Sequence, residues 1–310
     1  MSARRLAAID CGTNSIRLLV ADLPDDPGQR ELLDVVRRME IVRLGAGVDR
    51  TGMLAPDAIE RTRVVLADYT RQLRDLGAER VRMVATSASR DAGNAEDFRR
   101  MVRATLGAEP EVISGDEEAR LSFTGAVRGL TSRDPAPYLV VDIGGGSTEF
   151  VTGTTAVEHA ISVDIGCVRM TERHLHSDPP TADEIAAAEA DIDATVARAL
   201  SAVPGKEAAT VVGLAGTVTT VAAIALGLSR YDAARTHHAR ISAAAVAEVT
   251  RALTQMTSAE RRAIPVMHPG RADVIAAGAL VLRSVLTQAG ADHVVASEHD
   301  ILDGIAYSLL

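Results

Sequence analysis

Apolar runs and short glycine-bearing turns alternate along this chain. The apolar runs at residues 6–9 and 139–141 each end at an aspartate and a glycine turn, and a second apolar run follows each turn. These second runs carry β-branched residues and alternate between apolar and polar positions, which is typical of strands. The pattern therefore predicts a strand, a glycine turn and a second strand at two places in the chain.

The two turns share a sequence pattern. Residues 10–17 read DCGTNSIR and residues 142–149 read DIGGGSTE, so both contain D-x-G-x-x-S. One copy alone would favour an ordinary glycine-rich hairpin, whereas two copies favour a duplicated turn that admits phosphate to backbone amides. Neither copy matches a dinucleotide fingerprint or a P-loop. The repeat predicts two domains, 1–130 and 131–310, facing each other across a cleft, and the final helix, about 297–310, could pack back on the first.

Three segments have helical signals of different kinds. Residues 181–200 open with the T-x-x-E pattern of a capping box, and residues 270–286 form an apolar helical pattern. The uncharged residues 210–228 are just long enough to span a bilayer. We interpret them as buried core, because the threonines and Gly216 divide them into a strand at 210–214, a turn and a helix.

One acidic residue is a candidate general base. Ser114 and Glu117 have the spacing of a capping box, which gives Glu117 a structural role. The next residue, Glu118, shares a largely small and apolar helix face and could be partly desolvated there, as a base that accepts a proton from water requires. A solvated first-turn glutamate that favours the helix dipole explains the residue equally well.

Two arginines are candidate ligands of phosphate oxygens. Arg90 follows a predicted strand in a loop of small residues, from which its guanidinium could bind phosphate, although it could also pair with Asp91. Arg271 lies at the entrance to the apolar helix and could likewise face a cleft. Arg17 is a weaker candidate, because its place in a predicted strand leaves its direction open.

Composition narrows the classes of function. The chain has 310 residues and a formal net charge of −9, and it contains no tryptophan, which argues against nucleic acid and anionic membranes as partners. Lys206 is the only lysine, so phosphate would have to be bound by arginines or backbone amides. Cys11 and Cys167 lie far apart and indicate neither a disulfide framework nor a zinc site. The N-terminal segment lacks the apolar core of a signal peptide, and we expect a cytoplasmic protein.

These motifs together resemble the exopolyphosphatase and guanosine pentaphosphate phosphohydrolase family of the actin-like ATPase superfamily. The resemblance implies an α/β fold with two actin-like, ribonuclease H-like domains flanking an interdomain cleft. In longer relatives an additional helical domain extends the polyphosphate channel. We therefore expect the present protein to act on short polyphosphate chains. The segments that carry the likeness are AAIDCGTNSIRLLVAD, EIVRLGAGVD, ATSASRDAGN, ISGDEEARLSFTGAV, VVDIGGGSTEF, DIGCVRMTE, GLAGTVTTVAA and RADVIAAGALVL.

The resemblance also implies roles for individual residues. Glu118 corresponds to the catalytic base of the family, and Asp142 and Glu149 to the acids that organise a Mg²⁺ ion, with Mn²⁺ as an alternative. Cys167 is expected to be a packing thiol. The residues expected to bind phosphate are Thr13, Asn14, Ser15, Arg90, Gly144, Gly145, Gly146, Ser147 and Arg271.

The expected reaction is hydrolysis of the terminal phosphoanhydride of inorganic polyphosphate, with release of orthophosphate. The nearest alternative is a guanosine pentaphosphate 5′-phosphohydrolase. More distant alternatives are a small-molecule kinase of the same superfamily and a non-catalytic sensor of the alarmone. Because family members commonly pair, the resemblance also implies a homodimer.

Overall fold

The computed structural model describes residues 4–24 and 31–310 of the chain. The chain divides into two compact units, Met1–Gly125 with Ile301–Leu310, and Ala126–Asp300. Each unit contains one mixed β-sheet with helices packed against it. The predicted α/β fold class is confirmed.

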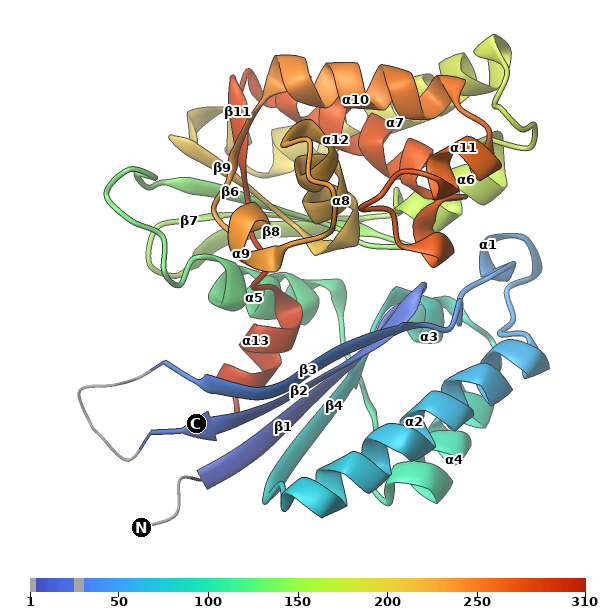
Figure 1. Ribbon diagram of the computed structural model, residues 1–310, viewed down its shortest axis with the longest axis vertical. Helices are drawn as coiled ribbons and strands as arrows, with labels where there is room; N and C mark the ends of the chain where they lie inside the picture. The colour runs from blue at the N-terminus through green and yellow to red at the C-terminus, as the bar shows by residue number, and fades with distance from the viewer. Residues whose placement is uncertain (1–3, 25–30) are drawn as a thin grey trace. The chain divides into compact units, whose positions relative to one another are not determined.

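The first unit is built on a five-stranded sheet in the order β3-β2-β1-β4-β5 (Figure 1). Strands β1, β2 and β3 are antiparallel neighbours, whereas β4 is parallel to β1 and β5 is parallel to β4. The two glycine-turn strands are thus the hairpin at the centre of the sheet. The strands are β1 (Arg4–Cys11), β2 (Ser15–Leu23), β3 (Leu33–Ile41), β4 (Arg80–Ala85) and β5 (Glu111–Val112).

Helices cover both faces of this sheet. Side chains alternate along β1, so Ala7 and Ile9 pack with residues of α2 and α4, whereas Leu6 and Ala8 pack with α13 (Figure 1). Because both faces are covered, β1 is apolar at every position from Leu6 to Ile9, which explains the apolar run seen in the sequence. The helices are α1 (Val48–Thr51), α2 (Pro56–Leu76), α3 (Ser87–Asp91), α4 (Ala95–Leu106), α5 (Gly115–Ala126) and α13 (Ile301–Tyr307).

The second unit repeats this strand arrangement. Its sheet has the order β10-β11-β9-β6-β7-β8, in which β6, β7 and β8 form an antiparallel meander and β9 and β11 are parallel to β6. Strands β6 to β9 and β11 therefore correspond to β1 to β5, and β10 is an addition. The strands are β6 (Tyr138–Ile143), β7 (Thr148–Gly153), β8 (Val157–Val163), β9 (Thr210–Leu214), β10 (Arg240–Ser242) and β11 (His293–Ala296).

The helices of the second unit enclose its hydrophobic core. The strand predicted at 210–214 and the helix after it are confirmed, and the Thr181 capping box is fully formed. The helix predicted from residue 270 begins at Ile275, because Pro269–Arg271 forms a separate 3-10 turn. The helices are α6 (Cys167–His174), α7 (Ala182–Ala202), α8 (Ala215–Ala225), α9 (Ala233–Thr236), α10 (Ala243–Gln255), α11 (Ser258–Arg262) and α12 (Ile275–Ala289).

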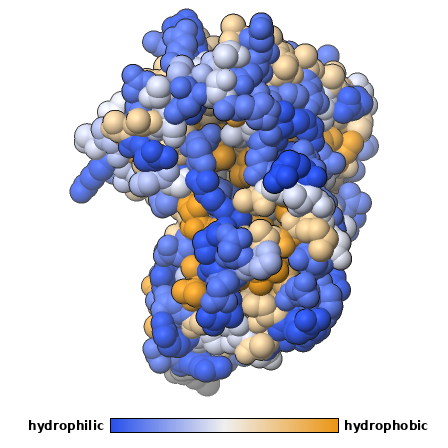
Figure 2. Space-filling view, turned by 90° about the vertical axis from the view of Figure 1, so that its right-hand side faces the viewer, coloured by the Kyte–Doolittle hydropathy of each residue, from blue (hydrophilic) through white to orange (hydrophobic). Residues whose placement is uncertain are grey.

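The face of the molecule drawn in Figure 2 is mainly polar. Hydrophilic residues cover most of this face, with hydrophobic ones interspersed. Within residues 4–24 and 31–310, no helix is both long enough and apolar enough to cross a bilayer.

Candidate active site

The two glycine turns are closed by the same backbone hydrogen bond. The amide of Gly12 donates to the carbonyl of Ser15 at 2.9 Å, and the amide of Gly144 donates to the carbonyl of Ser147 at 3.1 Å. Each turn connects the two strands of an antiparallel pair, β1 with β2 and β6 with β7. The repeated strand, turn and strand predicted from the sequence are therefore confirmed.

The aspartates that precede the turns have different cross-strand neighbours. Asp10 is directly opposite Arg17, and Asp142 is directly opposite Glu149. Directly opposed side chains lie on the same face of a sheet. Arg17 donates to Oδ2 of Asp10 at 2.6 Å, so the cross-strand pair of the first turn is an ion pair. The cross-strand pair of the second turn instead places two buried carboxylates on the same face of the sheet.

This pair of carboxylates suits a small divalent cation. Carboxylate oxygens are the ligands that hard cations prefer, and Mg²⁺ is commonly bound by one or two carboxylates together with waters and substrate phosphates. Among the described residues there is no group of three or more His, Cys, Asp or Glu side chains that could hold a metal ion. Two carboxylates do not complete the coordination of such an ion, so waters or substrate oxygens would supply the other ligands of a cation bound at Asp142 and Glu149. The hydroxyl of Ser162 donates to Oε1 of Glu149 at 2.7 Å and orients that carboxylate.

The start of helix α6 fixes the orientation of the second glycine turn. The carbonyl of Gly144 accepts from the amide of Cys167 at 2.9 Å, and the carbonyl of Gly145 accepts from the amides of Val168 and Arg169 at 2.8 and 3.1 Å. The side chain of Arg169 donates through Nε to the carbonyl of Gly146 at 2.7 Å. Three consecutive carbonyls thus point toward α6.

The orientation of these carbonyls determines where the amides point. In a trans peptide the N–H is directed opposite to the C=O, so the amides of Gly145, Gly146 and Ser147 point away from α6. In the described part of the chain these three amides form no hydrogen bond, and the buried Oγ of Ser147 has no partner either. Successive unpaired amides form a concave site for an anion. The predicted phosphate-binding turn has the required donors.

Close packing leaves the turn little room to move. A Cβ atom on Gly166, which precedes α6, would lie 2.3 Å from the carbonyl carbon of Gly145. Sequence reasoning did not select Arg169 or Ser162, the two side chains that hold the turn and its carboxylate. Arg169 lies in the DIGCVR segment and could have been chosen from it, whereas the sequence contains no signal for Ser162.

The first glycine turn is held by the segment that follows β3. The carbonyl of Asn14 accepts from the amides of Val42 and Arg43 at 3.0 and 2.8 Å, and the carbonyl of Thr13 accepts from the amide of Gly45 at 2.8 Å. The buried Oδ1 of Asn14 has no hydrogen-bond partner among the described residues. This side chain therefore retains an unused polar atom, while Ser15 contributes its carbonyl to the turn.

Short helix α3 connects the first turn to the candidate base. The Thr13 and Ser87 hydroxyls lie 2.8 Å apart, and Ser87 begins α3. Arg90, on the same helix, donates through Nη1 to Oε2 of Glu118 at 3.1 Å and to the carbonyl of Ile113 at 3.1 Å. The structure thus brings together the predicted residues of the first unit, which we call the first-unit cluster. Its members are Thr13, Asn14, Ser15, Arg90 and Glu118.

The alternatives left open for Arg90 and Glu118 are resolved by these contacts. Glu118 is only 8% exposed, so the solvated first-turn glutamate is wrong. Arg90 lies 3.9 Å from Asp91 and 3.1 Å from Glu118, so Glu118 is its nearer acidic partner. Arg90 also lies in helix α3 and not in the loop that was predicted. Its Nη2 forms no hydrogen bond within the described residues and is available to a ligand.

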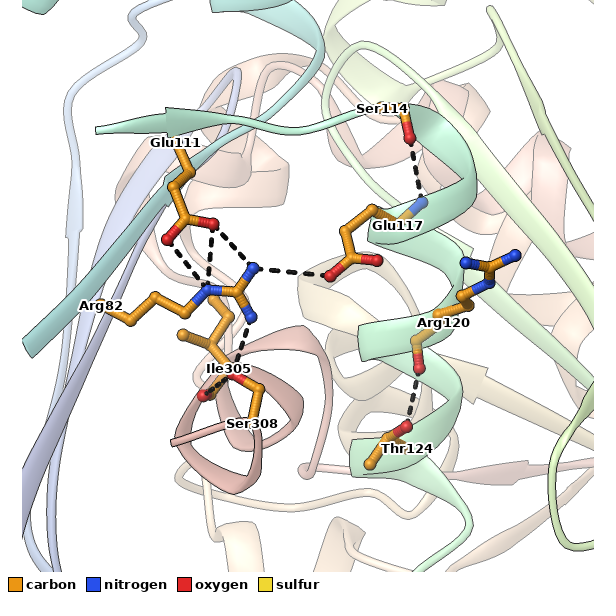
Figure 3. Close-up of polar contacts among 8 residues, drawn as sticks. All are labelled: Arg82, Glu111, Ser114, Glu117, Arg120, Thr124, Ile305 and Ser308. Atoms are coloured by element: carbon orange, nitrogen blue, oxygen red, sulfur yellow. Dashed lines mark hydrogen bonds and ion pairs between the residues drawn. The ribbon is translucent and has the colours of Figure 1, made fainter. Parts of the chain in front are cut away.

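The predicted capping box at the start of α5 is only half formed. The amide of Glu117 donates to Oγ of Ser114 at 3.2 Å, as expected. The Glu117 carboxylate, however, turns toward the guanidinium of Arg82, with Oε1 at 3.4 Å from Nη2 (Figure 3). The charged partner on β4 takes the place of the backbone amide of Ser114.

Arg271 lies against the first turn of α8. Its Nη1 donates to the carbonyl of Gly216 at 3.4 Å and to Oγ1 of Thr220 at 3.2 Å. A Cβ atom on Gly216 would lie 2.3 Å from the guanidinium carbon, so a side chain at this position would displace the guanidinium from its present place. Arg271 is also close enough to the Cys167 thiol to influence its ionisation. We call the predicted residues of the second unit the second-unit cluster, although Arg271 bonds to α8 and acts on Cys167, and neither of these contacts is with the turn. Its members are Asp142, Gly144, Gly145, Gly146, Ser147, Glu149 and Arg271.

Cys167 has the properties of a packing thiol. Burial raises its pKa to about 11, although a hydrogen bond with Thr217 and the charge of Arg271 act in the opposite direction. A thiol with this pKa is protonated at neutral pH, and the thiolate is the nucleophilic form. These observations agree with the interpretation of Cys167 as a structural residue.

Comparisons with known proteins place the chain in a family. It is 53% identical to Exopolyphosphatase 2 of Mycobacterium tuberculosis, over all of this chain and 99% of that protein. An exopolyphosphatase-like protein of known structure is 42% identical, with a TM-score of 0.95, and covers 100% of this chain and 98% of its own. The Aquifex aeolicus member of the Ppx/GppA family is 32% identical, with a TM-score of 0.82 and coverage of 99% and 98%. Residues 25–310 match the Ppx/GppA phosphatase family, and the chain belongs to that family.

Proposed function

We propose that this protein is an exopolyphosphatase that hydrolyses the terminal phosphoanhydride of inorganic polyphosphate and releases orthophosphate. The family and the similarity to Exopolyphosphatase 2 over the full chain support this activity. The observation that carries the proposal is the turn of Gly144 to Ser147, whose three free amides lie next to two opposed carboxylates. The free amides suit an anion, and the two carboxylates suit a cation that balances the negative charge of that anion.

Backbone amides and arginines would bind the substrate. The amides of Gly145, Gly146 and Ser147 would hold phosphate oxygens in the second unit. In the first unit, Arg90 would offer Nη2 and Asn14 its side-chain amide, with Thr13 and Ser15 beside them. Arg271 would neutralise further phosphate charge. At about 4 Å one guanidinium and one phosphate oxygen attract by about 4 kcal/mol at an effective dielectric of 20, so these local contacts outweigh the net negative charge of the chain.

Asp142 and Glu149 would hold the divalent cation, which we propose to be Mg²⁺, with Mn²⁺ as an alternative. When bound, this ion supplies positive charge beside the phosphate oxygens. The chain's own contribution is to orient the two carboxylates. Strand register places them opposite each other, and Ser162 fixes one oxygen of Glu149.

Glu118 would act as the general base that orients the attacking water and accepts its proton. Its burial removes competing bulk water, and the hydrogen bond from Arg90 stabilises the ionised carboxylate, which is the form that accepts a proton. Attack in line with the leaving phosphate oxygen needs no covalent phosphoenzyme. That the two clusters act on the same anhydride remains a prediction.

The substrate is tested by comparing phosphate release from short polyphosphate and from guanosine pentaphosphate at matched concentrations, each with added Mg²⁺. We expect faster release from polyphosphate and the highest kcat/KM on short chains. A strong preference for the nucleotide would contradict the proposed substrate. Formation of ADP from ATP that depends on an acceptor would favour a kinase, and ligand binding without turnover at any metal concentration would favour a sensor.

We further propose that the protein works as a homodimer in the cytoplasm, as the family resemblance implies. Light scattering coupled to size-exclusion chromatography should give twice the monomer mass, and a monomer at assay concentration would contradict the dimer. Fractionation of cells should place the protein with cytoplasmic markers.

A further inference from the structure

The C-terminal helix α13 makes a backbone-to-backbone contact with helix α5, which carries Glu118. A Cβ atom on Gly304 of α13 would lie 2.0 Å from the carbonyl oxygen of Leu121 and 2.9 Å from its Cα. Atoms this close cannot coexist, so any side chain at position 304 forces one helix to move. Leu121 is one turn beyond Glu118 on the same helix. The contact therefore controls how closely α5 approaches α13.

Helix α13 is itself fixed on the sheet of the first unit. Ile301, Leu302 and Ile305 are buried in a hydrophobic cluster with residues of β1, β2 and β4. The buried carboxylate of Asp303 receives two hydrogen bonds from Arg37 of β3, at 2.5 and 3.1 Å. A helix held by both an apolar face and an ion pair gives α5 a rigid surface to pack against.

A polar network connects the same two helices at the other side of Glu118. Arg82 of β4 donates to Oγ of Ser308, the residue after α13, at 2.7 Å. The same guanidinium binds Glu111 of β5 at 2.7 Å and reaches Glu117 of α5 at 3.4 Å (Figure 3). Glu117 precedes Glu118 directly. Contacts to α13 and Arg82 thus hold α5 at the residue before Glu118 and one turn after it.

We propose that helix α13 positions Glu118 for its reaction, with Gly304 and Arg82 as the positioning residues. The inference rests on the proposed function of Glu118 as the base. Glu118 accepts from Arg90 at 3.1 Å, a contact that fixes its carboxylate only if α5 stays in place. Neither Gly304 nor Arg82 belongs to the first-unit cluster, so both act through the position of α5.

The direct test is Gly304→Ala, measured by kcat and KM for phosphate release from short polyphosphate. The added methyl group requires a shift on the order of 1 Å, and a displacement of that size at a reacting group can reduce the rate about a hundredfold. We expect kcat to fall about tenfold to a hundredfold, with KM changed less than about threefold. The control is Ile192→Val, which removes one buried methylene from helix α7 in the core of the second unit and leaves the residues of α5 and α13 unchanged. It should lower the melting temperature and leave kcat unchanged.

A second variant decides the question if Gly304→Ala does not fold. Arg82→Gln removes the charge that holds Glu117 and Ser308, and we expect kcat to fall at least threefold with KM unchanged. Arg103→Gln is the matched control, because Arg103 also binds two glutamates, Glu96 and Glu109, neither of which lies on α5 or α13. Wild-type kcat in folded Gly304→Ala or in Arg82→Gln would overturn the proposal. Equal losses in the two controls would overturn it as well.

Glu118→Gln separates failure of this inference from failure of the proposed function. If Glu118 is not the base, Glu118→Gln alone will retain turnover, and the proposed function itself is wrong. If Glu118 is the base, adding Gly304→Ala to Glu118→Gln should change the residual rate less than twofold. A full additional loss in the double variant would mean that Gly304 does not act through Glu118.

Discussion

Asp10 and Asp142 occupy the same position in two similar turns, yet a single cross-strand residue gives them different chemistry. Opposite Asp10, Arg17 forms an ion pair at 2.6 Å and neutralises the carboxylate. Opposite Asp142, Glu149 adds a second acid on the same face. The cross-strand neighbour therefore leaves Asp10 paired with an arginine and Asp142 beside a second acid, and this second pair is the one that we propose as the cation ligands.

Replacement of Glu118 by glutamine should remove the proton acceptor while keeping the shape of the side chain. We expect kcat to fall about a hundredfold or more and KM to change little, because the amide can still contact Arg90 but cannot accept a proton from water. Steady-state phosphate release measures both constants. The control is Glu60→Gln, an exposed helical glutamate paired with Arg63, which should behave as wild type. Loss of activity through a raised KM alone would assign Glu118 to binding.

Replacement of Asp142 by asparagine should weaken the cation site. The variant loses one of two opposed carboxylates, and we expect the affinity for Mn²⁺ to fall at least tenfold, as measured by electron paramagnetic resonance of the free ion without substrate. Glu158→Gln, on neighbouring strand β8 and exposed, is the control and should leave Mn²⁺ binding unchanged. Unchanged Mn²⁺ binding in Asp142→Asn would contradict the assignment of this residue as a ligand.

At the scale of elements, helix α6 supports the turn that we propose to bind phosphate. Arg169→Gln removes the hydrogen bond to Gly146 and should let that peptide rotate, so its amide no longer points at the ligand. We expect KM for short polyphosphate to rise about tenfold, which corresponds to about 1.4 kcal/mol of lost binding. Arg173→Gln is the matched control, because Arg173 lies on the same helix but pairs with Asp191. Equal KM values in the two variants would contradict the supporting role of Arg169.

Elements with a local signal could be predicted from the sequence. The capping box of Thr181 depends on residues three positions apart, and the strand at 210–214 depends on a short apolar run, so both were predicted correctly. The repeated turns were also predictable, because the same short pattern recurs between apolar runs. Position 117 shows the limit of such signals. Its spacing from Ser114 predicts a capping box, but Arg82 lies far away in the sequence and attracts the carboxylate instead.

The contacts that orient the candidate site could not be predicted in this way. Arg169 reaches Gly146, Ser162 reaches Glu149, and Gly304 contacts Leu121, each across long separations in the sequence. Such pairs depend on the packing of whole helices and strands, and no local periodicity records them. The capping-box spacing pointed to Glu118, and the family resemblance supplied its role and those of Asp142 and Glu149, whereas the structure supplies the neighbours that orient them.

At the scale of the whole molecule, each unit buries one thiol beside its glycine turn. Cys11 directly precedes Gly12, and Cys167 donates its amide to Gly144. Burial raises the pKa of both thiols, that of Cys167 to about 11. Both units therefore keep a protonated thiol in the folded state at pH values where the unfolded chain already loses that proton.

This difference predicts that folding stability falls at alkaline pH. A thiol whose pKa is raised in the folded state contributes fully to the free energy of unfolding below its unfolded pKa of 9.0. It loses this contribution as the pH rises, and for Cys167 the loss is complete at about pH 11. Near pH 10, the ionisation of Cys167 alone should lower the free energy of unfolding by about 1 kcal/mol. Urea unfolding of the wild type and of the double variant Cys11→Ala and Cys167→Ala, at about pH 7.5 and about pH 10, measures the effect.

The double variant loses buried sulfur atoms and should be less stable than the wild type near neutral pH. Toward pH 10 the difference between the two proteins should narrow, because only the wild type must deprotonate thiols on unfolding. Tyrosines ionise in the same range, but both proteins contain the same four, so they cancel in the comparison. An unchanged difference between the two proteins across this pH range would mean that the thiols ionise equally in the folded and unfolded states, and it would contradict their raised pKa.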